Sequence, residues 1–171
     1  TWERYALVKA KLLGTNEDYG DYGDELISLL KPFVYRRYLD YGAVQSLRKL
    51  KHMIESEVRR RSLNNNFKLG QGGIREVEFI AQVFELMRGG RFEELRERSL
   101  RKTLKNIRAL DLLPENICTL LDDCYVYLRR LENVIQEFSD KQTQTLPDNE
   151  KDCARMLVAM NYQDKETFLH D

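Results

Sequence analysis

Apolar residues recur at three- and four-residue spacing along most of the chain, and this period predicts helices. The longest stripe lies between residues 115 and 139. It comprises Ile117, Leu120, Leu121, Cys124, Leu128, Leu131, Val134, Ile135 and Phe138. Such a stripe predicts one helix of about seven turns. Pro114 suits its first turn and Glu115 complements the positive end of its dipole, so we expect the central helix of the protein here.

Shorter stripes predict further helices. Their members are Leu47, Leu50, Ile54 and Val58, then Ile74, Val77, Ile80, Ala81, Phe84 and Met87, then Leu100, Leu104, Ile107 and Leu110. Gly42 is expected to precede the first of these helices, and Gly89 to end the second together with Gly90. Asp148 is expected to cap a last helix that runs to Met160. Only residues 64–69 suggest a strand, so the sequence predicts an all-α, antiparallel helical bundle formed as one domain over residues 1–171.

A glycine-rich stretch, residues 68–78, precedes one of the apolar stripes. Gly70, Gly72 and Gly73 can adopt positive φ, and without a Cβ their N–H groups can approach an anion closely where the next helix begins. Lys68 and Arg75 would flank that anion with positive charge. The stretch lacks the Gly-Lys-Ser/Thr end of a Walker loop and the strand-helix-strand setting of a dinucleotide site. Two interpretations stay open: a phosphate-binding loop, or a tight turn between packed helices.

Positive charge is concentrated around this stretch, although the formal net charge of the chain is +0. Residues 48–75 contain eight Lys/Arg and two carboxylates, Glu55 and Glu57. Such a local field suits a nucleotide or phosphate better than a long nucleic acid. The run at 59–61 alone is more typical of a solvated helix end.

Helical phase separates the two carboxylates that follow the glycines. Arg75, Glu78 and Gln82 share a polar face, with Glu78 the more exposed carboxylate, whereas Glu76 falls on a largely apolar side. The two glutamates therefore cannot form an acid/base dyad, and metal binding by both is not expected. For Glu76 two interpretations stay open: a buried structural ion pair, or a role in orienting Arg75 or Lys68.

These residues carry a family resemblance. The stretch from Phe67 to Phe79 resembles the Asn-Ile-Lys-Leu-Gly-x-Gly-Gly-Ile-Arg-Glu-Ile-Glu-Phe segment of bacterial glutamine synthetase adenylyltransferase, also called the adenylyl-removing enzyme. Further blocks resemble the same family in the same order: residues 2–10, 32–38, 57–61, 88–91, 128–133 and 142–147. The resemblance covers essentially the whole chain.

The resemblance implies a function. The family enzyme has two nucleotidyltransferase halves, each followed by a helical region, and Arg75 together with Arg4-Tyr5 resembles the N-terminal half. That half removes AMP from an adenylylated tyrosine of glutamine synthetase by phosphorolysis and releases ADP, while the other half uses ATP. The implied nucleotide- or phosphate-binding residues are Lys68, Gly70, Gly72, Gly73 and Arg75, with Arg4 and Lys9 facing the cleft and Glu76 in support.

One departure from the family limits this reading. The blocks Gly-Gly-x-Glu-Leu-Asn…Ser-Asp-x-Asp and Asp-Leu-Arg-Leu-Arg-Pro, which carry the catalytic carboxylates, do not occur in residues 1–171. We therefore expect an excised helical piece without catalytic residues, inactive alone, because Mg²⁺ would be held by a catalytic α/β domain that precedes it. Residues 1–13 would be the tail of that domain and 164–171 a truncated helix.

Three functional interpretations follow: a cleft wall of the adenylyl-removing half, a module that docks glutamine synthetase or a PII-type signal protein, or a spacer between catalytic halves. The expected partners also include the enzyme's own catalytic domains, but no nucleic acid or membrane. Cys118, Cys124 and Cys153 lack zinc-site spacing and are expected to be reduced, buried thiols of a cytoplasmic protein. Arg129 and Arg130 are expected to pair with Glu132 and other acidic side chains.

Overall fold

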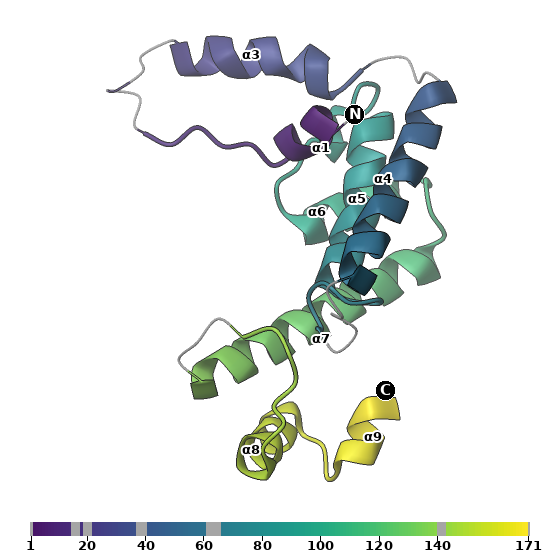
Figure 1. Ribbon diagram of the computed structural model, residues 1–171. Coiled ribbons are helices and arrows are strands. Elements are labelled where there is room, and N and C mark those ends of the chain that lie inside the picture. Colours follow the sequence, from purple (N-terminus) through teal and green to yellow (C-terminus); the bar gives the residue numbers. More distant parts are fainter. Residues whose placement is uncertain are drawn as a thin grey trace. The chain divides into compact units, whose positions relative to one another are not determined.

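The computed structural model describes residues 2–14, 18, 22–36, 41–60, 66–139 and 143–170. In these residues the regular structure is helical (Figure 1). The α-helices are α1 (Trp2–Leu7), α3 (Tyr22–Val34), α4 (Tyr41–Arg60), α5 (Ile74–Arg88), α6 (Leu100–Ala109), α7 (Glu115–Ser139), α8 (Glu150–Met160) and α9 (Lys165–His170), with a 3₁₀ turn η1 at Glu93–Leu95. An isolated antiparallel bridge joins Asn66 to Thr145, but the described residues form no sheet. The all-α prediction is confirmed.

The chain divides into two compact units. The first comprises Thr1–Ile54 and Glu78–Cys118, and the second Glu55–Val77 and Thr119–Asp171. Each unit is described by itself below. The assignment of residues 1–171 to one domain stays a prediction.

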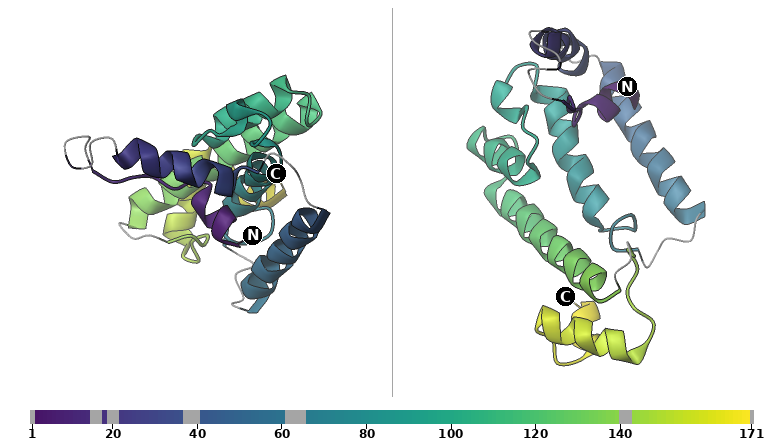
Figure 2. Two further views of the ribbon diagram at one scale, coloured as in Figure 1. Left: turned by 90° about the horizontal axis from the view of Figure 1, so that it is seen from above. Right: turned by 90° about the vertical axis from the view of Figure 1, so that its left-hand side faces the viewer.

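In the first unit, α1 and α3 pack against each other (Figures 1 and 2). Their contact is completed by Arg4, whose Nε and Nη2 donate to the carbonyl oxygen of Val34 at 3.1 and 2.8 Å. Val34 is the last residue of α3, so the buried guanidinium satisfies a carbonyl that the helix itself leaves without a donor. The apolar cluster beneath this contact is formed by Val8, Val34, Leu47 and Leu86, with Tyr5, Leu7, Tyr35, Val83 and Met87 packed around it.

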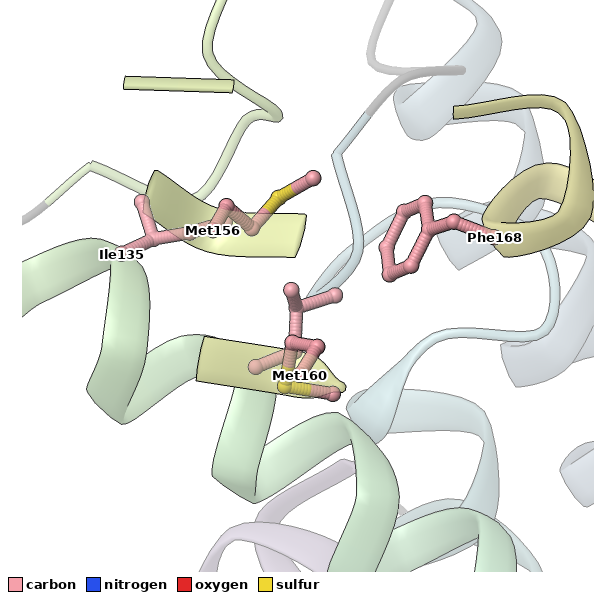
Figure 3. Packing of buried hydrophobic residues seen from close by; sticks show 5 residues of the cluster. Ile135, Met156, Met160 and Phe168 are labelled. Carbon is pink, nitrogen blue, oxygen red and sulfur yellow. The ribbon is translucent and has the colours of Figure 1, made fainter. Parts of the chain in front are cut away.

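In the second unit, a core forms between α7, α8 and α9. Its buried members are Leu131, Ile135, Met156, Met160 and Phe168. Figure 3 shows the side chains of Met156 and Phe168 extending toward each other from α8 and α9, with Met160 in the same cluster. The ring of Tyr162 meets Phe168 edge-on, with 5.2 Å between centroids. These contacts fix the C-terminal half of α7, which carries part of the candidate site.

Several helix boundaries can be compared with the sequence prediction. Helix α7 has the predicted bounds, and α5 begins at Ile74 as expected. Gly42, however, lies inside α4 and does not precede it. Asn149, not Asp148, caps α8, because its side-chain oxygen accepts from the amide of Asp152 at 2.8 Å.

Burial differs from the prediction in two places. Gln82, expected on the polar face of α5, is only 7% exposed. Its position, like that of Glu85 one turn later, is polar in sequence but enclosed by neighbouring helices. Of the cysteines, Cys118 is buried and Cys153 half-buried, whereas Cys124 is exposed. All three are free thiols, and burial raises the pKa of the Cys118 thiol.

Candidate functional site

The glycine-rich loop of the second unit is held in shape by Asn66, which is 7% exposed. Its side-chain oxygen accepts from the amides of Lys68 and Leu69 at 3.0 and 2.8 Å. This is an Asx turn, in which a short side chain replaces a backbone acceptor. The amide of Phe67 donates to the carbonyl of Gln144 at 3.1 Å, which ties the loop to the segment before α8.

Two of the three glycines are required by the backbone geometry. Gly72 has φ of 74°, a left-handed conformation that suits a residue without a Cβ. At Gly73 a Cβ would lie 2.7 Å from the carbonyl oxygen of Phe67 and 2.9 Å from that of Gly70. The loop therefore closes more tightly than any other residue at position 73 would allow.

The loop satisfies its own amides. Gly70 donates to the carbonyl of Asn66 at 2.6 Å, Gly73 to that of Gly70 at 3.0 Å, and Gly72 to Oε2 of Glu76 at 2.7 Å. The first amides of α5 are used in the same way. They donate from Ile74 to Phe67, from Arg75 to Lys68 and from Glu76 to Gly73, at 3.0–3.1 Å. In this conformation the glycines form a tight turn, the second of the two interpretations of the sequence, and an anion would have to compete for these donors.

Lys68 reaches across to α7. Its Nζ lies 3.1 Å from Oε1 of Glu132, and Nη1 of Arg129 lies 2.6 Å from Oε2 of the same carboxylate. Glu132 is only 5% exposed. Burial alone would raise its pKa, but the hydrogen bonds from Arg129 and Lys68 outweigh burial and lower it. The predicted pairing of Arg129 with Glu132 is confirmed, whereas Arg130 donates to the carbonyl of Ala159.

Arg75 and Glu76 leave the loop in different directions. Arg75 is exposed at the first turn of α5, and Glu76 is half-buried and folds back onto Gly72. A carboxylate in the first turn also complements the helix dipole. Glu76 thus acts on the glycine turn, and the roles suggested for it toward Arg75 or Lys68 stay predictions.

Arg4 and Lys9, the two other predicted phosphate ligands, belong to the first unit and make structural contacts there. Arg4 caps α3, and burial, helped by the nearby charge of Arg36, lowers the pKa of its guanidinium. Lys9 Nζ lies 2.6 Å from Oε1 of Glu85 and donates to the carbonyl of Glu97 at 2.8 Å. Their role toward a nucleotide is not tested by this geometry.

Sequence reasoning missed Glu85. Its side chain is fully buried, and Oε1 also accepts from the hydroxyl of Thr103 at 2.9 Å. Burial raises its pKa more than the hydrogen bonds from Lys9 and Thr103 lower it. The available signal was a glutamate between Phe84 and Leu86, in the most apolar part of α5. Asn66 was missed too, although an asparagine directly before a glycine loop is a known turn former.

The described side chains offer no metal site, since no three His, Cys, Asp or Glu residues among them group closely enough to hold an ion. Nor is any helix in that part of the chain both long and apolar enough to cross a membrane.

The described residues are helical, with a glycine turn that carries Lys68 and Arg75. The longest helix, α7, carries the buried carboxylate of Glu132. The chain belongs to the family described as GlnD PII-uridylyltransferase, whose model matches residues 48–170. More particularly, it is 53% identical over 167 residues to the bifunctional glutamine synthetase adenylyltransferase/adenylyl-removing enzyme of Psychromonas ingrahamii. The match covers 98% of this chain and 17% of that protein, so the chain spans about a sixth of its length. The resemblance found in the sequence is confirmed.

Proposed function

We propose that this chain is the helical region of the adenylyl-removing half of a glutamine synthetase adenylyltransferase. In that half, an oxygen of inorganic phosphate attacks the phosphorus of the adenylyl-tyrosine phosphodiester on glutamine synthetase. The bond from phosphorus to the tyrosine oxygen breaks, so the tyrosine hydroxyl is restored and the AMP group is released as ADP. The 53% identity to a bifunctional enzyme supports the family. The residues Arg75 and Arg4-Tyr5, which resemble the N-terminal half, support the choice of half. The chain has no catalytic carboxylate block of its own, so it is proposed to be inactive in isolation.

The observation that carries a phosphate-handling role is the fixed placement of Arg75. Its amide donates to the carbonyl of Lys68 and the amide of Glu76 donates to that of Gly73, so the backbone on both sides of the Arg75 Cα is held to the loop. The residue is nevertheless exposed. A pre-positioned guanidinium suits a phosphate or phosphodiester, because its planar fork can grip two oxygens at once. In this proposal the glycines build the platform and Arg75 makes the contact.

The remaining components belong to the whole protein. Mg²⁺ and the nucleotides ATP and ADP are proposed to bind the catalytic domains, and glutamine synthetase and a PII-type signal protein are the proposed partners. A cytoplasmic location is proposed with them. Lys68 and the three glycines stay proposed phosphate ligands in the second unit. Arg4 and Lys9 stay proposed ligands as well, and their contacts in the first unit favour a role through its packing.

The test uses Arg75→Ala in the full-length protein, with Arg155→Ala as the matched control. Arg155 is an exposed arginine on α8 that pairs with Asp152 one turn before it. We expect phosphate-dependent ADP release to fall about a hundredfold in Arg75→Ala, the typical loss when one charge-stabilising donor is removed. Adenylylation by the other half should be unchanged in both variants. Normal ADP release from folded Arg75→Ala would refute the role of Arg75.

A second function is favoured by the surface of α3. Four of its apolar or aromatic side chains are exposed: Tyr22 (78%), Leu26 (44%), Leu29 (67%) and Phe33 (43%). They recur at helical spacing, which is the pattern of a face that docks another protein. In this reading glutamine synthetase or the signal protein binds α3. Leu29→Glu should then weaken partner affinity without changing turnover at saturating partner, the opposite of the result expected for Arg75→Ala.

A further inference from the structure

Glu132 holds two cations through different oxygens, and the two contacts are unequal. Arg129 lies 2.6 Å from Oε2 and is only one turn away on the same helix. Lys68 lies 3.1 Å from Oε1 and comes from the loop, 64 residues away in sequence. If Lys68 leaves, the carboxylate therefore keeps its closer partner and does not become a buried, uncompensated charge.

The lysine is the partner able to move. Its side chain is 23% exposed, against 6% for that of Glu132, so its ammonium group has a path to solvent. Four methylene groups let the ammonium turn while the backbone, fixed by Asn66, stays in place. Within the trio of Lys68, Arg129 and Glu132 there are two positive charges and one negative charge. The trio by itself therefore carries net positive charge, which favours an approaching dianion.

The residue that carries a second cation is adjacent to Lys68 in the backbone. The amide of Arg75 donates to the carbonyl of Lys68 at 3.0 Å, so the first turn of α5 begins beside Lys68. Arg75 is exposed. A phosphate at the mouth of the loop could thus be held by Arg75 and by Lys68 once Lys68 turns away from Glu132.

We propose that Lys68 is an exchangeable cation: a phosphate dianion binds beside Arg75 by displacing Glu132 as the partner of Lys68, while Arg129 retains Glu132. The inference rests on the proposed function, because it supplies the phosphate subsite of that reaction. It assigns Glu132 as a competitor of the ligand and Arg129 as the residue that makes release possible. The glycine amides need not open, since they stay bonded within the loop.

Removal of the competitor gives the decisive test. In the full-length protein, Glu132→Gln should bind inorganic phosphate more tightly, because Lys68 no longer has to leave a carboxylate. If Lys68 spends about nine tenths of its time on Glu132, the Kd should fall about tenfold. A residue that only stabilised the fold would change affinity in the opposite direction or not at all. Titration calorimetry at constant ionic strength measures the Kd, and a thermal melt confirms folding.

Two further variants separate exchange from simple charge. Arg129→Gln should weaken phosphate binding although Lys68 is intact, because Lys68 becomes the remaining cation on Glu132. Adding Glu132→Gln to Arg129→Gln should restore binding to near the level of the single Glu132→Gln variant. Lys68→Met in the Glu132→Gln background should remove the gain. Parallel titrations with ADP distinguish the attacking phosphate from the phosphates of the product.

The outcomes are distinguishable from failure of the proposed function. Direct binding does not require turnover, so tighter phosphate binding by Glu132→Gln would support the exchange even if Arg75→Ala left ADP release unchanged. Unchanged or weaker binding of both phosphate and ADP by folded Glu132→Gln, or no recovery in the double variant, would overturn it.

Discussion

Lys9 and Glu85 form an ion pair, 2.6 Å between Nζ and Oε1, that joins the segment after α1 to the middle of α5. The carboxylate is fully buried, and 30% of the lysine side chain is exposed. Thr103 on α6 donates to the same oxygen, and Lys9 also reaches the carbonyl of Glu97. Three parts of the first unit thus meet at one buried carboxylate, and the N-terminal segment is held by polar contacts as well as by apolar packing.

Lys9→Met should destabilise the protein because it leaves the carboxylate of Glu85 without its cation. Loss of one partner of a fully buried pair costs roughly 3–5 kcal/mol, and the partial exposure of Lys9 reduces this to about 2–3 kcal/mol. The free energy of unfolding from urea titration measures the loss. The double variant Lys9→Met/Glu85→Gln should recover much of it, because no charge is then buried. A Lys9→Met variant as stable as the parent protein would show that water reaches Glu85.

The two buried glutamates should respond to pH with opposite sign. Burial raises the pKa of Glu85, so the folded state keeps its proton at a higher pH than the unfolded chain does. Between the ordinary glutamate pKa and this raised value, the contribution of Glu85 to the free energy of unfolding falls as pH rises. Glu85→Gln should remove this dependence, so its stability relative to the parent should improve as pH rises through that window.

The contribution of Glu132 to the free energy of unfolding changes with pH in the opposite direction. Its hydrogen bonds with Arg129 and Lys68 outweigh burial and lower its pKa, so its contribution is present above the ordinary glutamate pKa and is lost as pH falls through the folded value. Urea titrations of the parent, Glu85→Gln and Glu132→Gln proteins from about pH 3 to 7 compare the two signs. If the free energy of unfolding, relative to the parent, changed with pH in the same direction in both variants, the opposite pKa shifts of Glu85 and Glu132 would be contradicted.

The sequence contained much of the fold but little of the electrostatics. Period alone located α5, α6 and α7, because each buries one continuous stripe. The buried polar residues were harder to find, since the environment of Gln82 and Glu85 depends on which helices cover that face of α5. The glycine loop was located correctly, but its hydrogen bonds were not. Whether an amide faces an anion or a carbonyl depends on the backbone path, which spacing does not encode.

Gly73 and Gly72 should tolerate alanine differently. A Cβ at Gly73 would approach the carbonyl oxygen of Phe67 to 2.7 Å, and because both atoms belong to a hydrogen-bonded turn, neither can yield easily. We expect Gly73→Ala to cost about 1–3 kcal/mol. Gly72→Ala meets nothing within 4 Å and should cost about 1 kcal/mol, from its positive φ. Urea unfolding compares them, and hydrogen exchange at the amide of Ile74 reports whether the turn opens. Equal costs would mean that the loop relaxes around position 73.

The cap of α8 offers a test with a neighbouring control. The Asn149 side chain accepts from the amide of Asp152 at 2.8 Å, and its Nδ2 donates to the Asp152 carboxylate at 2.8 Å. Asn149→Ala removes both bonds and should cost about 1 kcal/mol. Asp148→Ala should cost a few tenths of a kcal/mol at most, because this exposed residue lies outside the cap. Since Met156 and Met160 on α8 enter the core of the second unit, the loss should appear in its cooperative unfolding. A larger loss in Asp148→Ala than in Asn149→Ala would restore the cap to the position that the sequence first suggested.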